Sequence, residues 1–190
     1  MFTLQTRYLS FFFGLISVLS FFNIIYSYYL NLYLNLDTYY FSLIISFLLS
    51  IIFYKIKVNE NKQTIFDKIL TVFFGYLLIP LVLSIPFYLS IYNLTFLNSY
   101  FESISGFTST GFTIFENIKH VDQSLILWRS STQWIGGLYF LFSIIFLIDI
   151  YDDNFKKSLT NFISFNSSEI FKQAIKIFLL YSSLTLIIFI

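Results

Sequence analysis

Long hydrophobic runs separated by short polar segments make up most of this 190-residue chain. Four runs lie within 8–30, 39–54, 69–92 and 125–148, and a fifth begins near residue 174 and continues to the last residue. A helix needs roughly 18–25 apolar residues to cross a bilayer, and several of these runs reach that length. The pattern predicts an all-α membrane protein with about five transmembrane helices.

The first and third runs carry features that refine this prediction. The first run is longer than the roughly 7–15-residue core of a cleavable signal peptide, so we expect it to be retained as a helix. Pro80 and Pro86 lie inside the third run. Each proline removes a backbone donor and crowds the preceding turn, so we expect the third helix to be kinked.

Basic residues are distributed unevenly between the two sets of loops. One set holds little beyond Lys119, whereas the other holds Arg7, Lys55, Lys57, Lys62, Lys68, Lys156, Lys157, Lys172 and Lys176. Loops rich in Lys and Arg stay in the cytoplasm. The N-terminus is therefore predicted to be cytoplasmic, and the segment 93–124 is predicted to lie outside.

Composition excludes several kinds of chemistry. The chain contains no cysteine, which rules out disulfides, thiolate metal sites and cysteine nucleophiles. Its single histidine, His120, cannot form a histidine metal cluster. A net charge of +1 gives no indication of a nucleic-acid partner.

The outer segment 93–124 is too short to span the membrane and too apolar for an exposed loop. A helix over 94–107 would be about 21 Å long, whereas the hydrocarbon core is about 30 Å thick. We therefore predict a re-entrant pore helix that returns through an extended strand at 108–113. Non-helical backbone at membrane depth is tolerated only where protein buries it or water lines it.

The residues of this strand suit a bare cation. Carbonyl oxygens of an extended strand, helped by a threonine hydroxyl, can replace the hydration shell of an ion. Gly111 permits backbone angles that turn carbonyls toward the ion. The C-terminal end of the pore helix carries about half a negative charge, which also favours a cation.

Two motifs in this region resemble the first pore unit of the Trk/Ktr potassium-uptake family. They are FESISGFTSTG at 101–111 and WRSSTQWIGG at 128–137. The resemblance, which is to the TrkH branch, implies a partial TrkH-type fold. In that fold four helix–pore loop–helix units surround one ion path, and the glycine of each loop lies in the selectivity filter. The implied ion-binding residues are Thr108, Ser109, Thr110, Gly111 and Phe112, with K⁺ held by the backbone carbonyls of Thr110 and Gly111.

Glu102 and Arg129 are the acid and base expected below the outer interface, where charges are usually paired or functional. We expect them to form an ion pair that supports the pore helix against the fourth run. The alternative is that each side chain reaches water separately. Thr132 and Gly136 offer a small-residue face for close helix packing.

The predicted domains are an N-terminal two-helix pair at 1–60, the first pore unit at 61–150, and a cytoplasmic linker with the start of a truncated second unit at 151–190. The resemblance implies potassium uptake across a bacterial inner membrane, with no cofactor besides the transported K⁺. It also implies a homodimer, a cytoplasmic nucleotide-binding regulatory subunit, contact with membrane lipid and no nucleic acid. Because one unit cannot enclose an ion, we expect the chain to be a fragment.

Two other classes of protein remain open at this point. An intramembrane serine protease would need Ser105 or Ser109 beside His120 as its base. A non-transporting membrane protein, such as an assembly partner or an inactive truncated product of the same family, is the second alternative. The residues favour a transporter, and we do not expect an enzyme.

Overall fold

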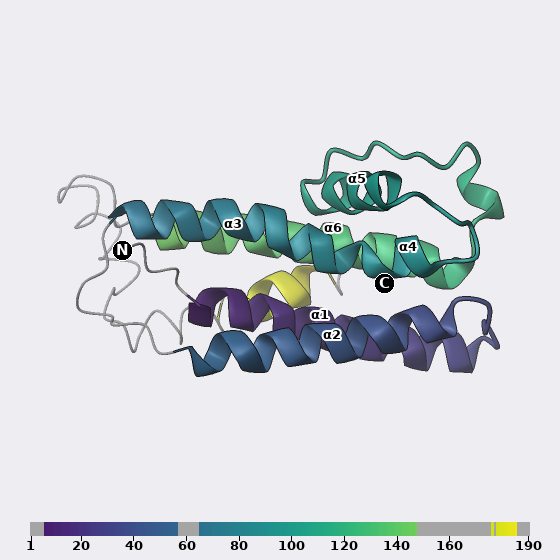
Figure 1. The fold of residues 1–190 in the computed structure, drawn as a ribbon, viewed down its shortest axis with the longest axis horizontal. Coiled ribbons are helices and arrows are strands. Elements are labelled where there is room, and N and C mark those ends of the chain that lie inside the picture. Colours follow the sequence, from purple (N-terminus) through teal and green to yellow (C-terminus); the bar gives the residue numbers. More distant parts are fainter. Residues whose placement is uncertain (1–5, 57–64, 148–175, 177, 186–190) are drawn as a thin grey trace. The chain divides into compact units, whose positions relative to one another are not determined.

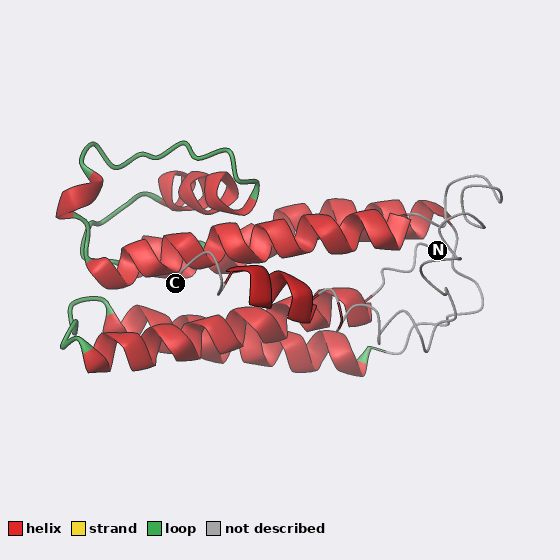
Figure 2. Ribbon diagram, turned by 180° about the vertical axis from the view of Figure 1, so that it is seen from behind, coloured by secondary structure: helices red, strands yellow, loops and turns green. Residues whose placement is uncertain are grey.

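The computed structural model describes residues 6–56, 65–147, 176 and 178–185. The described residues form helices and connecting loops, with no strand among them (Figures 1 and 2). The chain divides into two compact units, Met1–Gly137 and Leu138–Ile190. Nearly all the described residues belong to the first unit, which contains the features discussed below. In the second unit, the described residues 178–185 are helical and belong to the predicted fifth run.

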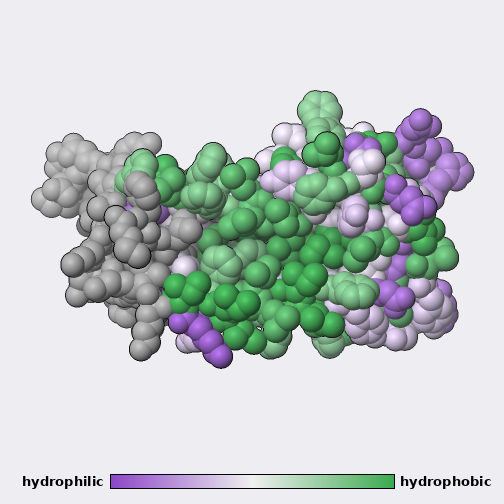
Figure 3. All heavy atoms as spheres, viewed as in Figure 1, coloured by the Kyte–Doolittle hydropathy of each residue, from purple (hydrophilic) through white to green (hydrophobic). Residues whose placement is uncertain are grey.

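Three stretches of helix in the described part are long and apolar enough to cross a membrane. The first two are α1 (Thr6–Tyr29) and α2 (Leu36–Lys55). The third combines α3 (Ile65–Leu83) with α4 (Ile85–Leu89). Hydrophobic side chains cover the middle of these helices on the face drawn in Figure 3, and hydrophilic ones gather near the loops. The chain is therefore a helical membrane protein.

Serine and glycine residues bring α1 and α2 into close contact (Figure 1). The Ser10 hydroxyl donates to the Ser50 carbonyl at 2.8 Å, and the Ser50 hydroxyl donates back to the Ser10 carbonyl at 2.9 Å. Further along, the Ser20 hydroxyl donates to that of Ser42 at 3.1 Å. A Cβ at Gly14 would lie 3.3 Å from the Ser50 Oγ. Lipid gives helices no hydrophobic reason to associate, so small side chains and interhelical hydrogen bonds take that role.

The third run is interrupted between the two prolines that predict its kink. Pro80 lies inside α3, and the helix is interrupted at Ser84 before Pro86 enters the first turn of α4. Proline is tolerated in that first turn because the missing donor would have no intrahelical partner there. Near the interruption, the Leu83 carbonyl accepts a hydrogen bond from another helix: the Trp128 indole donates to it at 3.0 Å.

A network of polar side chains joins the α1–α2 pair to the start of α6 (Gln123–Leu147). Asn35 Nδ2 donates to Asp122 Oδ2 at 2.9 Å, and the Ser124 hydroxyl donates to the same oxygen at 2.5 Å. The Tyr39 hydroxyl bonds that of Ser124 at 2.9 Å, and Asn23 Nδ2 donates to the Ser124 carbonyl at 3.2 Å. α1 and α2 are thus attached to α6 at the end where the predicted outer loops lie.

The helix bounds differ from the predicted runs by a few residues. The second run was placed at 39–54, whereas α2 extends from Leu36 to Lys55. Its ends include Asp37 and Lys55, which hydropathy alone assigns to the flanking loops. Of the predicted third domain at 151–190, only residues 176 and 178–185 are among the described residues.

The serine contacts between α1 and α2 give a stability prediction. In a double-mutant cycle, Ser20→Ala and Ser42→Ala should show a coupling of about 0.6 kcal/mol in the free energy of unfolding, the average for hydrogen bonds between membrane helices. The measurement is reversible unfolding in mixed micelles. Ser46→Ala is the matched control, because the Ser46 hydroxyl donates to the Ser42 carbonyl of its own helix. Pairing Ser46→Ala with Ser20→Ala should give a coupling near zero, and equal couplings for both pairs would contradict the assignment.

Candidate functional site: helix α5 and the segment after it

The outer segment folds as a short helix followed by an irregular return. The helix is α5 (Phe96–Phe107), whose 12 residues span about 18 Å. It begins at Thr95, whose side chain accepts the Asn98 backbone N–H at 3.3 Å as an N-cap. The short helix predicted between residues 93 and 107 is therefore present, and α3 and α4 pack against it.

The end of α5 is a complete Schellman motif. The Ser109 N–H donates to the Gly106 carbonyl at 2.9 Å, and the Thr110 N–H donates to the Ser105 carbonyl at 3.1 Å. These bonds require a left-handed residue after the helix, and Ser109 fills this position with φ 55°. Glycine is the usual residue there. The motif was not predicted from the sequence because a serine stands where glycine would have signalled it.

Gly111 provides a second left-handed residue, with φ 80°. A Cβ added at Gly111 would meet nothing within 4 Å, so the glycine is needed for its backbone angle and not for lack of space. Two left-handed residues therefore flank Thr110. The extended strand predicted at 108–113 is therefore wrong in its first residues: the chain turns at Thr108 and Ser109 and continues as irregular backbone, which we call the return strand. The two positive φ angles turn neighbouring carbonyls away from the alternation of a β-strand.

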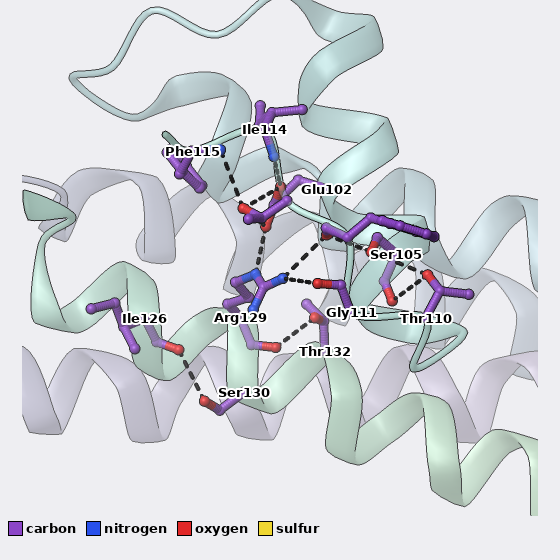
Figure 4. Close-up of polar contacts among 12 residues, drawn as sticks. Glu102, Ser105, Thr110, Gly111, Ile114, Phe115, Ile126, Arg129, Ser130 and Thr132 are labelled. Atoms are coloured by element: carbon purple, nitrogen blue, oxygen red, sulfur yellow. Dashed lines mark hydrogen bonds and ion pairs between the residues drawn. The ribbon is translucent and has the colours of Figure 1, made fainter. Parts of the chain in front are cut away.

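The Glu102 carboxylate on α5 accepts hydrogen bonds from the return strand (Figure 4). Its side chain is 0% exposed. It accepts the Ile114 N–H at 3.0 Å and the Thr113 hydroxyl at 3.1 and 3.2 Å. Arg129 of α6 donates Nε–H to Glu102 Oε1 at 2.5 Å. The expected pairing of Glu102 with Arg129 is thus present, and the separate solvation of the two side chains is not.

Arg129 also binds the return strand directly. Its Nη2 donates to the Phe112 carbonyl at 3.2 Å and approaches the Gly111 carbonyl at 3.4 Å (Figure 4). The Ser105 hydroxyl donates to the same Phe112 carbonyl at 2.6 Å. The strand is therefore held by a carboxylate on α5, a guanidinium on α6 and a hydroxyl on α5.

Two glycines allow α5 and α6 to approach closely enough for these bonds. A Cβ at Gly106 would overlap the Thr132 hydroxyl, and a Cβ at Gly136 would overlap the Phe107 carbonyl. Thr132 and Gly136 therefore form the close helix contact expected from their spacing. This contact sets the separation across which Arg129 reaches Glu102.

The five predicted ion-binding residues lie together directly after α5, and His120 lies further along the chain. Thr108 and Ser109 lie in the turn that ends α5, and Thr110, Gly111 and Phe112 lie in the irregular backbone after it. His120 ends the short helix η2 (Ile118–His120), and its backbone bonds Asn117 and the Tyr92 hydroxyl. The Ser105 hydroxyl donates to the strand. The arrangement therefore does not join a serine to His120 as a protease would require.

The long apolar helices define the chain as a helical membrane protein. Its curated relatives are named as a cation transporter and as potassium uptake proteins. It is 38% identical over 64 residues to an uncharacterized cation transporter of Methanocaldococcus jannaschii. It is 42% identical over 60 residues to the Trk system potassium uptake protein TrkI of Halomonas elongata. It is 39% identical over 46 residues to the Trk system potassium uptake protein TrkG of Escherichia coli. These relatives confirm the resemblance that the two motifs indicate.

The similarity covers a limited part of each protein. The matches include 34%, 32% and 24% of this chain, and only 14%, 11% and 10% of the respective relatives. No family model matches the chain. No solved structure matches it. The relatives are named as transporters and not as enzymes, which supports cation transport in general.

The buried carboxylate gives a prediction on stability. Glu102→Ala would leave Arg129 and the Ile114 N–H without their acceptor, so we expect a loss of about 3–5 kcal/mol in the free energy of unfolding. Thermal unfolding in detergent measures this loss. Glu116→Ala is the matched control, because Glu116 is an exposed acid of the same loop and should change stability by less than about 0.5 kcal/mol. Equal effects of the two substitutions would show that Glu102 does not anchor the strand.

Proposed function

We propose that this chain supplies one quarter of a cation-selective filter in a Trk-type potassium-uptake transporter. The proposed ligands of K⁺ are among the backbone carbonyls of the segment 108–112, with those of Thr110 and Gly111 foremost. Conduction needs no catalytic step. A cation moving inward gains about 2.3 kcal/mol per 100 mV of membrane potential.

The observation that carries this proposal is the irregular strand held at the end of α5. Regular helices satisfy their own carbonyls, so a membrane protein can present carbonyls to an ion only where the backbone leaves the helix. Here Ser109 and Gly111 leave it with positive φ angles. Glu102 binds the strand at the Ile114 N–H, and Arg129 binds Glu102. Both act as supporting residues in this proposal.

The proposed topology has about five transmembrane helices, with α5 as a re-entrant pore helix. At 12 residues, α5 reaches roughly 18 Å and does not span the hydrocarbon. The uneven distribution of Lys and Arg supports a cytoplasmic N-terminus and an outer position for α5 and the return strand. The proposed location is a bacterial inner membrane.

The proposed complete transporter contains four such units, a second copy of the same protein, and a cytoplasmic nucleotide-binding regulatory subunit. The likeness to Trk proteins supports these partners. K⁺ is the transported ion in this proposal, and no resident cofactor is needed. A filter built from one unit would leave most of the ion's coordination shell empty, so the remaining units are required for conduction.

Complementation of a bacterium that lacks potassium uptake tests the proposal. The full chain is expressed alone, and in a second strain it is joined to the part of TrkG that lies beyond the matched segment. We expect growth at low external K⁺ only in the second strain. Absence of growth there, with both proteins present in the membrane in equal amounts, would favour a non-transporting membrane protein.

Gly111 and Ser109 give a matched pair of substitutions in the joined protein. Gly111→Ala forces a Cβ into a left-handed conformation at a cost of about 1–2 kcal/mol, so we expect K⁺ uptake to fall roughly 5- to 30-fold. Ser109→Gly removes the same kind of strain and should preserve uptake. Initial rates of Rb⁺ uptake at equal membrane amounts measure both effects. Retention of full uptake by Gly111→Ala would show that this backbone angle is not required.

A further inference from the structure

The carbonyl of Phe112 has two donors, whereas that of Gly111 has one, Arg129 Nη2 at 3.4 Å. The Ser105 hydroxyl donates to the Phe112 carbonyl at 2.6 Å, and Arg129 Nη2 donates to it at 3.2 Å. A carbonyl oxygen has two lone pairs, so both are engaged. The aromatic ring of the same residue is 69% exposed. The Phe112 carbonyl is thus fully engaged by α5 and α6, whereas the Gly111 carbonyl keeps one lone pair for a further ligand.

We propose, on the basis of the proposed function, that Ser105 is a positioning residue that ends the row of ion-facing carbonyls at Gly111. Phe112 would then be an anchor of the strand and not a ligand of the ion. The strand between Ser109 and Gly111 would present the carbonyls that bind the cation. Ser105 never touches the ion and acts through the backbone it holds.

Ser105 is well placed for this role because it binds the strand at two points. Its side chain is buried, at 3% exposure, in the last turn of α5. Besides holding Phe112, its hydroxyl oxygen lies 3.2 Å from the Thr110 hydroxyl, which donates to it. Its own carbonyl accepts the Thr110 N–H at 3.1 Å. One residue therefore fixes the strand on both sides of Gly111.

Ser103 provides a matched control two residues away on the same helix. Its side chain is 0% exposed, and its hydroxyl donates to the Pro80 carbonyl at 2.7 Å. Both serines are buried in α5 and both donate to a backbone carbonyl. Ser103 binds the kinked helix α3, whereas Ser105 binds the strand.

The test uses the full chain joined to the remaining units of TrkG, with Rb⁺ and Na⁺ uptake measured at equal membrane amounts. Ser105→Ala should lower the Rb⁺ to Na⁺ uptake ratio roughly fivefold, the effect of one lost neutral hydrogen bond. Ser105→Thr keeps the hydroxyl and should restore the ratio. Ser103→Ala should lower the amount of folded protein and leave the ratio unchanged. If Ser105→Ala does not accumulate, Ser105→Cys keeps the volume with a weaker donor and should change the ratio in the same direction.

The outcomes separate this inference from the proposed function. Uptake by the unsubstituted protein with an unchanged ratio in Ser105→Ala, or in Ser105→Cys, would overturn the role of Ser105 and leave the transport function intact. An equal change of ratio in Ser103→Ala would also overturn it, because the effect would then follow from helix packing. No uptake by the unsubstituted protein, at a normal membrane amount, would overturn the proposed function and the inference with it.

Discussion

The hydrogen bonds of the buried Glu102 carboxylate are the interactions on which the rest of the site depends. Backbone that leaves a helix at membrane depth has polar groups that lipid cannot satisfy. Glu102 provides an acceptor for the Ile114 N–H and for the Thr113 hydroxyl, and Arg129 compensates its charge. Because a buried charge is costly without its partner, the pair ties α5, the strand and α6 into one unit.

Close packing of α5 against α6 is the second requirement, and it follows from the absence of two side chains. Gly106 and Gly136 have no Cβ at the points where Thr132 and the Phe107 carbonyl lie against them. A larger residue at either position would separate the helices. The bond of 2.5 Å between Glu102 and Arg129 would then lengthen, and the strand would lose its anchor. The geometry of the strand therefore depends on the close packing of α5 against α6.

Much of this arrangement could be predicted from the sequence because long apolar runs, prolines and paired membrane charges are local signals. The prolines indicated where the third run is interrupted, and the pairing of Glu102 with Arg129 was predicted from their position. The Schellman end was not, because Ser109 takes a left-handed angle that serine seldom adopts. The hydrogen bond from Ser105 to the Phe112 carbonyl was not predicted either, since it depends on tertiary contacts that no sequence period encodes.

The ion pair also determines where attraction for a cation can come from in the proposed filter. The guanidinium of Arg129 lies on the Gly111 and Phe112 carbonyls, whereas the carboxylate of Glu102 binds Thr113 and Ile114, so the pair shapes the strand and does not itself attract a cation there. The carbonyls of Ser105 and Gly106 at the end of α5 are engaged by Thr110 and Ser109. The helix dipole then acts at a distance, while direct coordination falls to carbonyls of the strand. Selectivity would therefore depend on the angles at Ser109 and Gly111, which the surrounding hydrogen bonds hold in place.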